Sequence, residues 1–198
     1  MGAGITFKNL TIGYRSKHQL RAVASSIHAS LQEDKLTCLI GANGVGKSTL
    51  LRTLSGFQPP LDGEILIQDK PLSDYSAREL AQEIGVVLTN RMDTPQLSVQ
   101  EIVGIGRSPY TGFWGTLSSA DQKIVDEAIR QTGIQHLASR SITELSDGER
   151  QKVMIAKALA QQTSLIILDE PTAFLDFPSK VETLQMLRRL AHDQHKSI

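Results

Sequence analysis

The sequence predicts an α/β domain, a mixed sheet with flanking helices, that carries an inserted α-helical subdomain. Two short apolar runs, residues 36–40 and 164–168, have the length and composition of buried strands. Each run leads into a turn and then into a segment with helical spacing. Between them, residues 99–138 follow a helical pattern. We therefore expect an α/β core from residues 1–90 and 141–198, and a helical subdomain from about residue 91 to 140.

The other elements follow from local periodicity, in chain order. After the first strand, apolar residues at helical spacing end at Ser55 and Gly56, a pair typical of a helix end. The further strands and helices predicted in this way cover residues 63–67, 76–83, 84–88, 99–105, 121–131, 150–160 and 178–195.

A glycine-rich turn lies between the first predicted strand and the helix that follows. It reads Gly41-Ala42-Asn43-Gly44-Val45-Gly46-Lys47-Ser48-Thr49. Glycines can turn successive N–H groups toward phosphate oxygens, and the helix N-terminus adds partial positive charge. Lys47 can reach the β- and γ-phosphates, Ser48 can ligate Mg²⁺, and Thr49 would help to hold the α-phosphate. The alternative, a structural turn with an incidental lysine, is disfavoured by the two motifs that follow.

Two acids stand at the end of the second apolar run. Asp169 and Glu170 precede Pro171, which ends strand pairing because it lacks an N–H group. Ligands bind at the carboxyl ends of strands in open α/β sheets. Asp169 can therefore hold Mg²⁺, directly or through a water, and Glu170 can polarise a water for attack on a γ-phosphate.

Between these motifs lies the stretch Leu145-Ser146-Asp147-Gly148-Glu149, directly before a helix. Ser146 and Glu149 have the spacing of a capping box. The N–H groups and dipole that such a box organises also form an anion site, and Gly148 leaves the backbone open to a phosphate. We expect both functions to hold.

The three stretches, in this order, resemble those of the ATP-binding subunit of ABC transporters, and the resemblance covers nearly the whole chain. Residues 41–49 match the Walker A motif, residues 165–169 match Walker B, and Glu170 falls at the catalytic carboxylate. Residues 145–149 match the signature LSGGQ, with Asp147 and Glu149 replacing its third and fifth residues. Asp176 falls in the D-loop, and Tyr14 stands where the family has an aromatic residue that stacks on adenine. The alternative is an exposed loop tyrosine without such a role.

Two departures from the family pattern affect the expected activity. Thr89 occupies the position of the usual Q-loop glutamine, and Asn90 has suitable chemistry one residue late. The family also has a further strand ending in a histidine that contacts the γ-phosphate. His192 and His195 are instead expected to be solvated residues of the last helix. We therefore expect a C-terminally truncated domain that binds ATP better than it hydrolyses it.

The resemblance implies ATP and Mg²⁺ as ligands and a homodimer that sandwiches two nucleotides. It also implies integral membrane permease subunits, an indirect periplasmic or lipoprotein substrate-binding protein, and a peripheral position on the cytoplasmic face of the bacterial inner membrane. The segment Gly106-Arg107-Ser108-Pro109-Tyr110-Thr111-Gly112 resembles that of ATPases serving importers of iron chelates, haem and cobalamin. The aromatic residues at 110, 113 and 114 are expected to pack the small subdomain or to contact a membrane partner, and both can hold for different residues.

The composition and the absence of certain motifs narrow the alternative classes of protein. With 21 basic and 21 acidic residues the net charge is zero, which disfavours a nucleic-acid-binding domain. The sequence shows no transmembrane run and no signal-peptide pattern, and the single Cys38, expected in a buried strand, fits a reducing compartment. A soluble ABC ATPase in cofactor (Fe–S) assembly remains the alternative. A P-loop GTPase would need an Asn-Lys-x-Asp segment, which is absent from the sequence, and a small-molecule kinase would not need residues 145–149.

Overall fold

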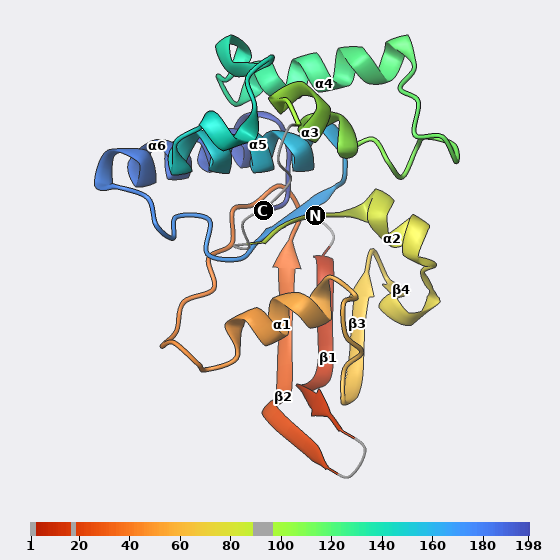
Figure 1. Cartoon of the computed structure of the whole chain (residues 1–198). Coiled ribbons are helices and arrows are strands. Elements are labelled where there is room, and N and C mark those ends of the chain that lie inside the picture. The colour runs from red at the N-terminus through yellow and green to blue at the C-terminus, as the bar shows by residue number, and fades with distance from the viewer. Residues whose placement is uncertain (1–2, 17–18, 89–96) are drawn as a thin grey trace. The chain divides into compact units, whose positions relative to one another are not determined.

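The computed structural model describes residues 3–16, 19–88 and 97–198. The chain divides into two compact units (Figure 1). The first comprises Met1–Leu80 and Ala191–Ile198, and the second comprises Ala81–Leu190. The first unit contains the glycine-rich turn at residues 41–49. The second unit contains residues 145–149 and the two acids Asp169 and Glu170.

An antiparallel sheet with the strand order β2-β1-β3-β4 is the framework of the first unit (Figure 1). β1 (Ala3–Arg15) pairs with β2 (Leu20–Gln32) on one side and with β3 (Asp62–Ile67) on the other, and β4 (Lys70–Pro71) pairs with β3. Ile5 and Phe7 are buried, as are Leu10 and Ile12. Phe7 and Leu10 are three positions apart, an odd spacing that would place their side chains on opposite faces of a regular strand. A register shift between these two residues lets both side chains point into the core.

Helix α1 (Lys47–Leu54) contacts β1 within the first unit (Figure 1). It ends as the sequence predicts, because Ser55 is the C-cap and Gly56 follows with φ 73°. Beyond β4, a 3₁₀ turn (Leu72–Asp74) leads into α2 (Ala77–Glu83), which confirms the predicted short helix. The predicted strand at residues 63–67 is also confirmed, as β3.

The prediction of a buried strand at residues 36–40 is wrong. The segment belongs to no strand, Ile40 is 91% exposed and Cys38 is exposed. Its described backbone pairing is with the end of the chain, where Thr37 N donates to the carbonyl of Ile198 and Ile198 N donates to that of Lys35. An apolar run becomes a strand only where a neighbouring strand offers a ladder, and sequence propensity cannot supply that neighbour.

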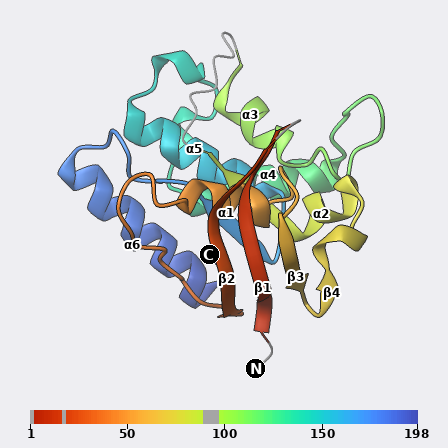
Figure 2. The same cartoon turned by 90° about the horizontal axis from the view of Figure 1, so that it is seen from below.

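The second unit combines a two-stranded parallel sheet with helices. β5 (Ile84–Val87) pairs in parallel with β6 (Leu165–Leu168), and both confirm predicted strands. Helices α3 (Val99–Ile105), α4 (Ser119–Gln131) and α5 (Asp147–Ala160) pack on one another (Figure 2), and α5 also contacts β5. Two 3₁₀ turns (Gln135–Leu137 and Ile142–Glu144) lie between α4 and α5, and α6 (Phe177–Asp193) follows β6.

A buried arginine ties the ends of three helices together in the second unit. Arg107, 5% exposed, follows α3 and pairs through Nε with a carboxylate oxygen of Asp121 on α4 at 2.9 Å. Its Nη1 donates to the carbonyl of Ala160 at the end of α5 and to the side chain of Gln162. Hydrogen bonds from Ser118 and Arg107 lower the pKa of Asp121 to about 2. Arg107 thus has a structural role that accounts for its place in the segment at residues 106–112.

The aromatic residues after this arginine do not form a buried plug. The Arg107 guanidinium lies over the Tyr110 ring, 4.1 Å from the ring centroid, so Tyr110 packs partly within the second unit. Phe113 and Trp114 are 96% and 87% exposed and stack edge to face on each other at 5.4 Å. The packing interpretation is therefore wrong for these two residues. Within the described ranges, none of the helices combines the length and apolar character that crossing a bilayer requires.

Candidate functional site

The N-terminus of α1 has the features of a phosphate cradle. Its N-cap is Gly46, in a left-handed conformation with φ 109°, and no described side chain caps the helix. A Cβ on Gly46 would lie 2.4 Å from Val23 Cγ1, so only glycine fits there. Gly44 has φ 81°, and a Cβ there would meet no described atom within 4 Å. The loop backbone is therefore exposed at the point where the first-turn N–H groups of a helix lack intrahelical partners.

The side chains of this turn carry the donors that a polyphosphate needs. The Lys47 ammonium donates to the carbonyl oxygens of Gly41 and Ala42, at 2.7 and 2.9 Å. It therefore lies along the loop itself, where an anion would compete with these two carbonyls. Ser48 and Thr49 follow in the first turn of α1, and Thr49 is buried. Residues 41–45, including Asn43 and Val45, are exposed.

Tyr14 lies on β1 and not in a loop, which corrects that part of the sequence-based alternative. β1 continues to Arg15 because β2 pairs with it to the end, with Tyr14 opposite Arg21. The Tyr14 hydroxyl lies 2.9 Å from the Thr49 hydroxyl, so the tyrosine contacts the glycine-rich turn at its last residue, within the same unit. No sequence signal links these residues, which stand 35 positions apart.

In the second unit, the two acids stand where the sequence predicts, directly after β6. Asp169 N donates to the carbonyl of Val87 at the end of β5, so the parallel pairing extends to this residue. Glu170 is exposed and has φ 50°, an unusual conformation for a residue with a side chain. Strain of this kind is stored at functional sites more often than elsewhere.

The N-terminus of α5 is a complete capping box. Ser146 accepts from Glu149 N at 3.3 Å, and the Glu149 carboxylate accepts from Ser146 N and Oγ at 2.8 and 2.7 Å. These bonds lower the pKa of Glu149. Asp147 pairs with Arg150 at 3.6 Å. A Cβ on Gly148 would lie 3.1 Å from Ser179 Oγ, which gives this glycine a packing role beside the expected open approach to its backbone.

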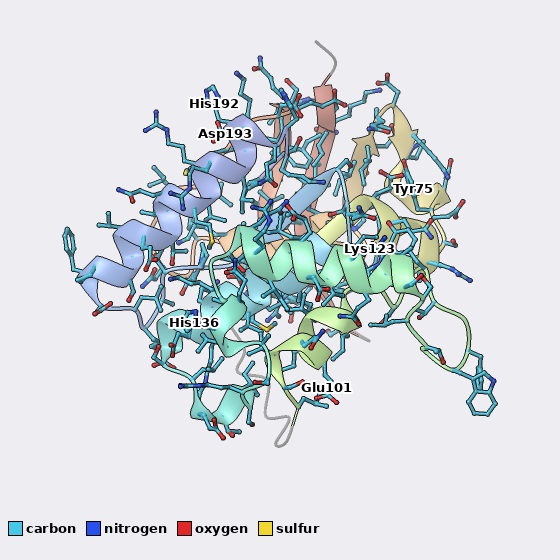
Figure 3. All side chains as sticks on the ribbon, turned by 90° about the horizontal axis from the view of Figure 1, so that it is seen from above. Tyr75, Glu101, Lys123, His136, His192 and Asp193 are labelled. Carbon is cyan, nitrogen blue, oxygen red and sulfur yellow. The ribbon has the colours of Figure 1, made fainter. Side chains whose placement is uncertain are left out.

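The remaining predicted positions are Asp176, the two histidines near the end of α6, and the Q-loop residues. Asp176 caps α6, accepting from Ser179 N at 3.0 Å, and this bonding lowers its pKa. His192 lies exposed near the end of α6 (Figure 3), and His195 lies beyond the helix, exposed, with its Nδ1 3.4 Å from a carboxylate oxygen of Asp34. Both histidines are solvent-exposed as expected. Thr89 and Asn90 lie outside the described residues.

Comparisons with known proteins identify the family of this chain. The family model described as "ABC transporter" matches residues 24–173. An uncharacterized ABC transporter ATP-binding protein of Methanocaldococcus jannaschii is 40% identical over 96% of this chain and 64% of its own length. The ferric enterobactin transport ATP-binding protein FepC of Escherichia coli is 36% identical over 94% of this chain and 68% of its own length. The chain thus spans about two thirds of the length of these relatives.

A solved structure supports the fold in the same way. A dimeric ATP-binding cassette in a post-hydrolysis state, bound to ADP and Pi, matches with a TM-score of 0.81 and 26% identity, over 98% of this chain and 85% of that one. The fold is therefore that of a P-loop nucleotide-binding cassette. The chain belongs to the family of ABC transporter ATP-binding proteins.

Proposed function

We propose that this chain binds and hydrolyses ATP as the motor subunit of an ABC importer. The observation that carries the proposal is the N-terminus of α1, where a left-handed glycine replaces a side-chain cap and Lys47 lies along an exposed loop. This arrangement suits the phosphates of a nucleotide, because N–H groups and an ammonium converge on one loop. The relatives are transport ATP-binding proteins, which fits the same activity.

In this proposal each motif residue has a separate role. Residues 41–49 hold the phosphates, and Tyr14 stacks on the adenine. Ser48 and Asp169 offer the hard oxygen ligands that Mg²⁺ prefers, and the ion would neutralise phosphate charge. Glu170 positions and deprotonates the attacking water. Its exposed, positive-φ conformation directly after β6 supports that assignment.

The proposal also includes a homodimer in which Ser146 and Gly148 of one copy contact the nucleotide held by the other. Its support is the dimeric cassette that matches this fold and the match of residues 145–149 to the family signature. In this proposal Asp147 and Glu149 belong to the same signature stretch, Asp176 belongs to the D-loop, and Thr89 or Asn90 takes the Q-loop position. Such a head-to-tail exchange closes under twofold symmetry. ATP-driven closure would then move a membrane permease between states.

The transported substrate in this proposal is an iron chelate, haem or cobalamin. The segment at residues 106–112 and the identity to a ferric enterobactin transport ATP-binding protein support this class. The subunit would act at the cytoplasmic face of the membrane, with a substrate-binding protein delivering cargo to the permease. Co-purification with a polytopic membrane protein separates this function from soluble Fe–S assembly.

The test uses Lys47→Ala and Glu170→Gln in the full chain. Calorimetric titration with MgATP should show at least a tenfold weaker affinity for Lys47→Ala, because the ammonium charge on the phosphates is lost. Lys8→Ala, an exposed lysine on β1, is the matched control and should bind normally. Glu170→Gln should bind ATP with near-normal affinity, lose hydrolysis, and shift from monomer to dimer in light scattering. Normal ATP affinity in Lys47→Ala would falsify the proposed site.

A further inference from the structure

The hydroxyl groups of Tyr14 and Thr49 form a hydrogen bond of 2.9 Å that joins β1 to α1. Thr49 is 5% exposed, whereas Tyr14 is 48% exposed. The polar end of the tyrosine is therefore held by the helix, while part of its ring remains open to solvent. The bond lies within the first unit, on the turn to which the proposed function assigns the phosphates.

A second chain of contacts fixes the same two elements. Gln58 Nε2 donates to the carbonyl of Gly13, beside the tyrosine, at 3.2 Å and to Thr53 Oγ1 at 3.1 Å. Thr53 Oγ1 in turn donates to the carbonyl of Thr49 at 2.8 Å. The backbone before the tyrosine and the first turn of α1 are thus linked independently of the hydroxyl pair.

Close packing restricts the backbone before the tyrosine further. A Cβ on Gly13 would lie 2.1 Å from the carbonyl oxygen of Arg21 and 2.8 Å from Leu61 Cδ1. Only glycine permits this approach between β1 and β2. The remaining freedom of Tyr14 is the rotation of its side chain, and the bond to Thr49 restricts that rotation.

We propose that Thr49 is a positioning residue for the Tyr14 ring, so that base binding and phosphate binding are coupled through one hydrogen bond. The inference rests on the proposed function, since it takes nucleotide to be the ligand of this unit. Because Thr49 engages the only polar atom of the ring, Tyr14 offers the base an aromatic face at a fixed orientation. A ring held in advance loses less rotamer freedom when a base stacks on it.

The test compares MgATP with Mg-tripolyphosphate, which has the phosphates without the base. Calorimetric titration gives the ratio of the two affinities for the wild-type chain, Tyr14→Phe, Thr49→Val and the double variant. Each single variant should lower the ratio about 3- to 10-fold, the range expected for one hydrogen bond. The double variant should lower it no further, because both changes remove the same bond.

Two controls separate positioning from general damage. Thr49→Ser keeps the hydroxyl and should keep the wild-type ratio. Tyr75, labelled in Figure 3, lies in the same unit, and its hydroxyl donates to the carbonyl of Ile67. Tyr75→Phe removes this hydroxyl and should also leave the ratio unchanged. Thermal unfolding of each variant confirms that it is folded at the titration temperature.

Different outcomes overturn different parts of the argument. A wild-type ratio in Tyr14→Phe, or a double variant whose loss is the product of the two single losses, overturns the positioning role and leaves the proposed function intact. A wild-type chain that binds tripolyphosphate as tightly as ATP overturns the positioning role and removes the base platform from the proposed function. A wild-type chain that binds neither ligand overturns the proposed function and this inference together.

Discussion

Helices α1 and α5 both begin at stretches that the sequence assigns to phosphate binding, yet their N-termini are built in opposite ways. α5 has a full capping box, in which Ser146 and Glu149 satisfy each other's backbone N–H groups. α1 begins at a left-handed glycine, and among the described residues no side chain caps it and no acid lies in its first turn. α3 and α4, in the same unit as α5, also begin with capping boxes.

The difference fits the role that the proposed function gives to each helix N-terminus. A capping box contributes about 1 kcal/mol of stability and uses protein groups to satisfy the helix end. The start of α1 lacks that stabilisation, and in the proposed function it offers its backbone to an external acceptor. A helix N-terminus without the side-chain cap that the other helices have is therefore the better indicator of a bound ligand. At α5, any contact with a phosphate must coexist with the Glu149 carboxylate.

The largest effect that tests this comparison is expected for Gly46→Ala. The substitution combines an unfavourable positive φ with a Cβ only 2.4 Å from Val23. We therefore expect the free energy of unfolding to fall by about 3 kcal/mol and ATP binding to be lost as well. Gly133→Ala is the matched control, because φ is 73° and a Cβ there meets no described atom within 4 Å. It should cost about 1 kcal/mol. Urea titration measures both, and equal losses would show that the loop does not require this packing.

A smaller effect is expected for Ser146→Ala, with Ser118→Ala as its counterpart on α4. Both serines cap their helices in the same way, so each change should cost about 1 kcal/mol of stability. Only Ser146→Ala should also reduce ATP-dependent dimerisation and hydrolysis. Equal activities of the two variants, measured at equal fractions folded, would leave Ser146 with a capping role alone.

The smallest effect appears only in acid. Hydrogen bonds from the capping serines lower the pKa values of Glu101 and Glu149, and those from Ser118 and Arg107 lower that of Asp121 to about 2. A lowered folded-state pKa stabilises the protein above the ordinary value near 4, and this contribution is lost as pH falls toward the lowered value. The urea midpoint should therefore be insensitive to these groups from pH 7 to about 5 and should fall below about pH 4.

Asp121→Asn isolates one of these carboxylates and should flatten the decline in acid. A decline of the same steepness in Asp121→Asn would show that this carboxylate does not contribute to acid unfolding.

Local signals in the sequence were sufficient for most elements of the fold. The spacing of Ser146 and Glu149 predicted a capping box, and Ser55 and Gly56 marked the end of α1, because both depend on neighbours within a few residues. The strand predicted at residues 36–40 failed because a strand also depends on a partner far along the chain. The odd spacing between Phe7 and Leu10 likewise becomes clear only with the register shift in β1.

The candidate site shows the same division. The glycines, Lys47 and Glu170 could be assigned from their order and from the strands and helices beside them. The bond between Tyr14 and Thr49 could not be predicted, because it joins two elements that meet only in the folded unit. The sequence also led us to place the aromatic residues 113 and 114 partly in a core, because hydrophobicity alone does not distinguish a buried ring from an exposed one.

The exposure of Trp114 has a practical consequence for spectroscopy. It is the only tryptophan in the sequence, so the indole fluorescence of the protein comes from a single loop between α3 and α4. Because that indole is 87% exposed, its emission should be red-shifted, as for a fluorophore in water. A blue shift on adding a candidate partner would therefore report that this loop has become covered, without any label being introduced.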